Sequence, residues 1–284
     1  MKKTLRFLLV ILLLGIGAVA YLWTAFTLYE PPFVQFRAAD EIEYQPKLPF
    51  CMQSTRPPEW LTQKRLRFLV WNMHKGADAG WQQDLARLAQ DRDFLLLQEV
   101  SSQQNLEHTL PIPFQSSLYG SAFAYQGEKS GVQMLSRFSP DLYCVASQAE
   151  PWIRIPKVAS AMRFPLNEQS ALLIVNVHFI NFEWQPQAYR SHLDKMMQLI
   201  AKHNGPVILT GDFNSWSQAR LAVLQELTTK YQLNAAKFMP DHRLYAFGNP
   251  LDQFFVRGAH IVQASTETVQ SSDHNPLLVE IELD

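Results

Sequence analysis

The chain has 284 residues, of which 47% are hydrophobic, 12% aromatic and 18% charged. This composition excludes a disordered chain, and the length is sufficient to bury a core without disulfide bonds. The formal net charge is −1, and the part from Pro31 onward carries 22 basic and 25 acidic residues. Such a mildly acidic body argues against a high-affinity, non-specific nucleic-acid binder, whose affinity depends on a basic surface, although local basic patches remain open.

The N-terminal segment, residues 1–30, predicts a membrane anchor. Residues 7–29 hold no formally charged side chain, and a helix of this length rises about 35 Å, enough to cross a hydrocarbon core. The basic residues lie before this run, so the positive-inside rule predicts a cytoplasmic N-terminus and a periplasmic body attached to the inner membrane by a single span. The alternative is a cleaved signal peptide, since residues 18–20 form an A-x-A site, and the body would then be secreted.

The next segment, residues 31–58, contains six of the 17 prolines of the chain. Because proline removes a backbone donor and fixes φ, this segment predicts an extended linker rather than a folded unit. The remaining residues, 59–284, fit a single domain. Cys51 and Cys144 are the only cysteines, too few for a disulfide framework or a zinc site, and the sequence leaves open whether they pair.

Within residues 59–284, short apolar runs alternate with amphipathic segments. Strands are predicted at residues 65–73, 94–100, 131–138, 159–164, 171–179, 206–210, 251–256 and 276–283. Helices are predicted at residues 81–90, at 187–203, and from a cap at Ser215 or Ser217 to about residue 231. Strands outnumber helices and the two are interleaved, which predicts an α/β sandwich with largely buried sheets.

Polar clusters interrupt these apolar strands, each at a strand end. They are Trp71-Asn72, Gln98-Glu99, Asn176-Val177-His178, Gly211-Asp212-Phe213-Asn214, Leu251-Asp252 and Ser272-Asp273-His274-Asn275-Pro276. Each has an ordinary explanation alone, since a Gly-Asp-x-Asn segment is typical of a turn and a single Glu or His of a solvated strand end. Buried polar groups need a partner, a metal or solvent, so their recurrence at strand ends indicates a shared pocket.

In this order the motifs WN, LLQEV, NVH, GDFN and SDHNP resemble the endonuclease/exonuclease/phosphatase superfamily, over about residues 66–283. This superfamily of metal-dependent phosphoesterases includes deoxyribonucleases and neutral sphingomyelinases, and the chain is similar in particular to a bacterial branch of it. The resemblance implies a four-layer α/β sandwich, in which two packed, mostly antiparallel sheets are flanked by helices behind the N-terminal transmembrane helix.

The resemblance also implies roles for the residues in these motifs. Glu99 would be the principal ligand of Mg²⁺, with Mn²⁺ or Ca²⁺ as alternatives, and Asn72 and Asp273 would complete the metal site. Asp212 would orient or deprotonate the attacking water, and Asn214 would hold a phosphate oxygen.

Two histidines complete the predicted catalytic set. His274 would act as an acid/base group or stabilise the transition state, with Asp252 fixing its tautomer and favouring the imidazolium. His178 would be a second histidine facing the phosphate. Gln253 follows Asp252 where the family commonly has an aromatic residue, which makes Asp252 the least secure member of the set. Trp216 stands where inositol polyphosphate phosphatases favour a basic motif, which argues against that substrate.

The sequence thus predicts a membrane-attached, metal-dependent phosphodiesterase, in which water attacks phosphorus directly without a covalent enzyme intermediate. Two substrate classes remain open. The anchor and the acidic body favour a phospholipid or small phosphodiester head group, whereas the motif set equally suits a nuclease acting on nucleic acid. The alternative function is a catalytically silent, membrane-anchored binding domain of the same fold, and the intact motif set argues against it. No protein partner is predicted.

Overall fold

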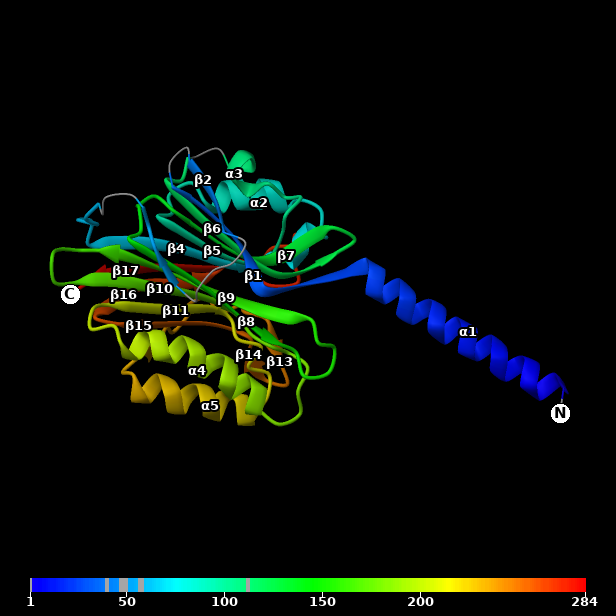
Figure 1. The fold of residues 1–284 in the computed structure, drawn as a ribbon. Coiled ribbons are helices and arrows are strands. Elements are labelled where there is room, and N and C mark those ends of the chain that lie inside the picture. The colour runs from blue at the N-terminus through cyan, green and yellow to red at the C-terminus, as the bar shows by residue number, and fades with distance from the viewer. Residues whose placement is uncertain (1, 39–40, 46–50, 56–58, 111–112) are drawn as a thin grey trace.

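The computed structural model describes the chain except residues 1, 39–40, 46–50, 56–58 and 111–112. Two β-sheets pack face to face, and helices cover both outer faces (Figure 1). This arrangement confirms the predicted four-layer α/β sandwich. A single long helix, α1 (Lys2–Ala25), projects away from the body at the end opposite to the C-terminus.

The first sheet has eight strands in the order β16-β17-β4-β5-β7-β6-β1-β2. Their bounds are β1 Phe26–Ala38, β2 Glu41–Gln45, β4 Arg65–Asn72, β5 Phe94–Ser101, β6 Ser116–Tyr125, β7 Glu128–Ser136, β16 Ala259–Thr266 and β17 Leu277–Leu283. Only β4 and β5 pair in parallel, so their carboxyl ends lie side by side, with Asn72 opposite Gln98. A 3-10 turn η1 (His74–Gly76) follows β4, and helices α2 (Trp81–Leu88) and α3 (Leu106–Thr109) pack on the outer face.

The second sheet has seven strands in the order β12-β15-β11-β10-β9-β8-β3. Their bounds are β3 Cys51–Gln53, β8 Leu142–Ala149, β9 Pro156–Pro165, β10 Ala171–His178, β11 Val207–Asp212, β12 Asn234–Ala235 and β15 Asp252–Arg257. β10 and β11 pair in parallel, which brings His178 opposite Asp212, and β15 pairs antiparallel with β11, which brings Asp252 opposite Asp212. Helices α4 (Gln187–Ala201) and α5 (Gln218–Lys230) cover the outer face, and β13 (Tyr245–Ala246) with β14 (Asn249–Pro250) forms a separate ribbon.

The structure differs from the linker predicted at residues 31–58 wherever it describes this range. β1 lies inside the first sheet between β6 and β2, with Val34 and Phe36 fully buried, and β3 extends the second sheet. Pro31 and Pro32 fall where the pairing of β1 with β6 shifts register, so their missing N–H groups remove no regular ladder bond. The other four prolines of the range, at positions 46, 49, 57 and 58, lie outside the described residues.

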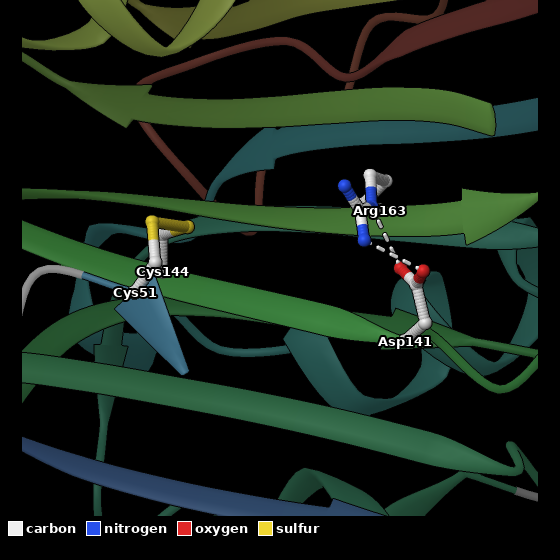
Figure 2. Close-up of a disulfide and its surroundings, with 4 residues drawn as sticks. All are labelled: Cys51, Asp141, Cys144 and Arg163. Atoms are coloured by element: carbon white, nitrogen blue, oxygen red, sulfur yellow. Dashed lines mark hydrogen bonds and ion pairs between the residues drawn. A yellow bond between two sulfur atoms is a disulfide. The ribbon is translucent and has the colours of Figure 1, made fainter. Parts of the chain in front are cut away.

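A disulfide joins the start of β3 to β8. Cys51 and Cys144 are register partners at the edge of the second sheet (Figure 2). Arg163 of β9 binds Asp141 through two hydrogen bonds of 2.9 and 2.8 Å nearby on the same sheet (Figure 2). The pairing that the sequence left open is therefore present, and it holds residues 51–53 onto the sandwich.

The part of α1 that could span a membrane is shorter than the apolar run at residues 7–29. The helix is apolar enough to span a membrane from Arg6 to Ala25, whereas residues 26–29 of the predicted span begin β1. Phe26 pairs with Tyr125 of β6, and the carbonyl of Ala25 accepts a hydrogen bond of 2.7 Å from the backbone N–H of Gln126. A further bond of 2.8 Å joins the hydroxyls of Tyr21 and Tyr125. The end of α1 is thus fixed to the turn between β6 and β7.

Candidate active site

The polar clusters predicted at strand ends converge where the carboxyl ends of the two parallel strand pairs meet. The side-chain amide of Asn72, at the end of β4, donates to Asp212 Oδ2, at the end of β11, over 3.0 Å. A second bridge between the sheets runs from the amide of Gln98 to Asn176 Oδ1, at 2.6 Å. These buried bonds fix the relative positions of the two sheets at this end, and the remaining site residues surround them.

Glu99 enters the site because β5 is distorted there. Its φ is 51°, a left-handed conformation that is uncommon for a non-glycine residue, and the register of β5 with β7 shifts between Leu97 and Val100. Lys75 Nζ lies 2.7 Å from Glu99 Oε2, and Lys157 Nζ lies 3.9 Å from Oε1. Burial raises the pKa of Glu99, but the charges of His178, Lys157 and Lys75 outweigh it and hold the pKa at about 2. Glu99 is therefore a carboxylate at any physiological pH.

Asp212 is a buried carboxyl group held by amides. Besides the bond from Asn72, its Oδ1 accepts from the backbone N–H of Asn214 over 2.8 Å, and its Oδ2 lies 3.6 Å from Nε2 of His178. Burial raises the pKa of Asp212 above its ordinary value, although the nearby His274 and His178 act in the opposite direction. A carboxylate with a raised pKa is a better proton acceptor than an exposed one.

His274 is held from both sides. Its Nδ1 lies 2.8 Å from Asp252 Oδ2, and both side chains are buried. Its backbone carbonyl accepts from the indole N–H of Trp71 over 2.9 Å, and its backbone N–H donates to the hydroxyl of Ser272 over 3.1 Å. Burial lowers the pKa of His274, but the charge and hydrogen bond of Asp252 outweigh it and raise the pKa to about 10. The structure thus places a cationic imidazolium beside Asp212.

The second histidine, His178, is neutral, whereas His274 is cationic. His178 is buried, and Lys157 Nζ lies 2.9 Å from its Nε2. Burial and the Lys157 charge lower the pKa of His178 to about 4, despite the neighbouring carboxylates of Asp212 and Glu99. His178 is therefore neutral at pH 7, and its Nε2 accepts a hydrogen bond from the lysine ammonium.

The side-chain amide of Asn214 contacts Phe179 and Asp212. Its side-chain NH₂ donates to the carbonyl of Phe179 over 2.9 Å and approaches Asp212 Oδ2 at 3.4 Å, so both of its hydrogens are directed at the protein. The contact of Asn214 with a phosphate oxygen stays a prediction. In this structure Asn214 orients Asp212.

Asp273 is more exposed than the other predicted metal ligands, Asn72 and Glu99. Its side chain is 54% exposed, and its Oδ1 is 3.4 Å from the Ser272 hydroxyl and 3.9 Å from Nδ1 of His74. Within the described part of the chain, no three His, Cys, Asp or Glu side chains converge as a ready-made metal site. The donors present, a Glu99 carboxylate and an Asn72 amide oxygen, do not suit zinc but suit Mg²⁺, which commonly takes one or two carboxylates and completes its shell with water and phosphate.

Arg220, in the first turn of α5, is a site residue that sequence reasoning missed. Its side chain is 1% exposed, and it donates to the carbonyls of Ile180, Asn181 and Asn214 over 2.9, 2.8 and 2.8 Å. Its guanidinium also lies over the ring of Trp216. A lone arginine at the start of a helix is normally solvated, so the sequence carries no signal for this role. Arg220 fixes the loops that follow β10 and β11.

A cavity of about 490 Å³ lies beside Glu99 and His178 of this cluster. Lys75, Glu99, Lys157 and His178 line its polar side. A larger cavity of about 1110 Å³ lies near residues 283–284, at the far end of the sandwich, and holds none of the predicted site residues. The charged and titratable side chains that line the smaller cavity therefore identify it as the candidate active site.

Comparison with known proteins identifies a family whose members are consistent with this site. Residues 69–274 match the Endonuclease/Exonuclease/phosphatase family, and the chain belongs to that family. Members of the family are phosphoesterase hydrolases. The chain is 34% identical over 284 residues to a UPF0294 protein of Vibrio cholerae, an alignment that covers 100% of this chain and 99% of the relative.

Solved structures of low sequence identity share the fold. A mannosyl-6-phosphatase of Bacteroides thetaiotaomicron superposes with a TM-score of 0.56 at 20% identity, covering 76% of this chain and 99% of that one. TDP2 of D. rerio, complexed with a single-stranded DNA product, superposes with a TM-score of 0.53 at 16% identity, covering 78% of this chain and 100% of that one. At these identities the likeness concerns the fold alone.

Proposed function

We propose that the protein is a metal-dependent phosphodiesterase that hydrolyses its substrate by in-line attack of a water molecule. The observation that carries this proposal is that one buried cluster holds both a proton acceptor and a cation. Asp212, whose pKa burial raises, is a proton acceptor, and the imidazolium of His274 is a fixed cation that interacts with it. A base for water beside a cation for developing phosphoryl charge is what hydrolysis of a phosphodiester requires.

The other side chains support these two groups. Asp252 keeps His274 protonated, while Asn72 and Asn214 orient the carboxylate of Asp212. His178 is neutral, with Lys157 against its Nε2, so this pair presents one positive charge to the cavity. That charge is suited to binding a phosphodiester monoanion.

We further propose that Glu99 and Asn72 hold Mg²⁺, with Asp273 completing the site and Mn²⁺ or Ca²⁺ as alternatives. The oxygen donors and the permanently ionised Glu99 support this assignment. When bound, the ion supplies polarisation of the phosphoryl oxygen and stabilisation of the leaving alkoxide.

Two observations support a location of the body at the outer face of the inner membrane. The apolar helix α1 is preceded by basic residues, which favours a cytoplasmic N-terminus and a periplasmic body. The Cys51–Cys144 disulfide is typical of proteins that work in an oxidising compartment.

The test is hydrolysis of bis(p-nitrophenyl) phosphate by the full chain in detergent, with and without Mg²⁺, beside the matching monoester. Asp212→Asn should lower kcat/KM by about 10²–10⁴-fold, the usual contribution of a positioned acid–base group. Its melting temperature at alkaline pH should stay equal or rise, because a neutral amide replaces a carboxylate whose ionisation burial disfavours.

The matched control is Asp91→Asn, which alters a surface carboxyl group whose side chain is 57% exposed and should leave the rate unchanged. Activity that persists in Asp212→Asn above about a tenth of wild type would contradict the role of this residue. Absence of Mg²⁺-dependent turnover would favour the silent binding domain.

A further inference from the structure

One wall of the catalytic cavity is apolar. Besides Glu99 and His178, the cavity is lined by Phe26, Ile153 and Ile155. Phe26 is the first residue after α1, and the two isoleucines lie in the loop between β8 and β9. A site built only for a soluble, charged diester has no need of this wall, because apolar surface offers nothing to a phosphate group.

The apolar wall continues out of the cavity along the membrane helix. A second cavity, of about 820 Å³, lies between Leu22 and Trp23 of α1 and the same loop, and it shares Phe26, Ile153 and Ile155 with the catalytic cavity. The two form one groove, which begins beside the carboxylate of Glu99 and ends on the last turns of α1. We call it the α1 groove.

The position of α1 places this groove at the depth of the bilayer surface. The end of α1 is fixed to β6 by the pairing of Phe26 with Tyr125, so the loop beside α1 must lie where the helix leaves the membrane. Two exposed tryptophans support this placement. Trp152 and Trp184 are 53% and 80% exposed, their rings are 5.4 Å apart, and tryptophan is enriched at membrane interfaces.

We propose that the substrate is a phospholipid of the membrane that holds the protein, bound with its phosphodiester at Lys157 and His178 and its acyl chains in the α1 groove. This inference rests on the proposed hydrolase function. One water is consumed, its oxygen bonds to phosphorus, one P–O ester bond breaks, and the leaving alkoxide takes a proton to become an alcohol beside a phosphomonoester. A lipid reaches the groove from the bilayer without leaving it, whereas a nucleic acid would have to approach a mildly acidic body against the membrane surface.

The experiment uses the full chain in vesicles of phosphatidylethanolamine and phosphatidylglycerol with Mg²⁺. Phosphomonoester and alcohol products are measured by mass spectrometry, beside hydrolysis of bis(p-nitrophenyl) phosphate and of a single-stranded oligonucleotide. We expect the vesicle lipid to be hydrolysed and the oligonucleotide to be the poorer substrate.

The groove is tested with Ile153→Gln. The ratio of lipid to soluble-diester hydrolysis should fall about tenfold, the size expected for losing the burial of one aliphatic side chain against an acyl chain. The matched control is Val262→Gln on β16, where an aliphatic side chain has a similar exposure, 43% against 47%, and both rates should stay at wild-type level.

A photoactivatable phospholipid, with a diazirine at the end of one acyl chain, gives a readout that is independent of turnover. Cross-links on the peptide containing residues 152–155 support the groove. Hydrolysis of the soluble diester or oligonucleotide without lipid hydrolysis or cross-linking would overturn the lipid assignment and leave the hydrolase intact. Cross-linking without hydrolysis of any diester would overturn the proposed function and, with it, the role of the lipid as substrate.

Discussion

Arg220 is expected to contribute more to stability than a surface arginine, because its buried guanidinium donates to three backbone carbonyls. Arg220→Met keeps the length of the side chain but removes the donors to three carbonyls at 2.8 to 2.9 Å. An unsatisfied buried acceptor costs about 1–3 kcal/mol, so three cost about 3–9 kcal/mol. The variant recovers part of this, since burying a guanidinium itself costs several kcal/mol, and the net loss should be about 3–5 kcal/mol.

The measurement is urea unfolding followed by tryptophan fluorescence, with thermal melting as a second probe. A loss of this size lowers the melting temperature by about 6–20 °C for a domain of this length. The control is Arg190→Met on α4, where the guanidinium pairs with Glu226 at the surface and is worth at most about 1 kcal/mol. If Arg220→Met destabilises the protein no more than Arg190→Met, the assignment of Arg220 as the support of the two loops is wrong.

Two further predictions concern stability. The disulfide closes a loop of 93 residues, so the Cys51→Ser/Cys144→Ser double variant should lose about 4–5 kcal/mol of unfolding free energy, and a reductant should have the same effect on the wild type but none on the variant. The pKa of His274 is raised to about 10 from 6.5, so the stabilisation by Asp252 is fully present below about pH 6.5 and is lost as the pH rises through 10. The difference in unfolding free energy between wild type and Asp252→Asn, measured in EDTA, should therefore shrink between pH 6 and pH 10, and a constant difference would contradict the pairing.

The strands that the sequence predicted are those with continuous apolar runs, and the structure has a strand at each of them. Within residues 59–284, the longer strands β6, β8 and β16 were missed, as were the two-residue strands β12, β13 and β14. β6 reads SSLYGSAFAY and β16 reads AHIVQAST, sequences with small and polar residues and no clear period. Such strands form because a neighbouring strand pairs with them, so the local sequence carries little of the signal.

The site was predictable to the extent that its residues belong to ordered motifs. The structure brings Asn72, Glu99, His178, Asp212 and His274 to one end of the sandwich, as the motifs require. The local sequence could not show the orientation of the Asn214 amide or the position of the Arg220 guanidinium. The orientation of Asn214, the buried position of Arg220 and the exposure of Asp273 all depend on tertiary contacts made by other segments.

The strand β1 fixes the position of the helix α1 relative to the candidate active site. An extended linker over residues 31–58, as the sequence predicted, would hold the body away from the bilayer. Instead, the chain passes from α1 directly into β1, and the hydroxyl bond between Tyr21 and Tyr125 adds to the backbone pairing. The catalytic cavity opens beside that junction, since Phe26 lines both it and the α1 groove. With α1 inserted in a membrane as proposed, a body held in this way would not follow a soluble polymer but would stay in contact with lipids that diffuse past α1.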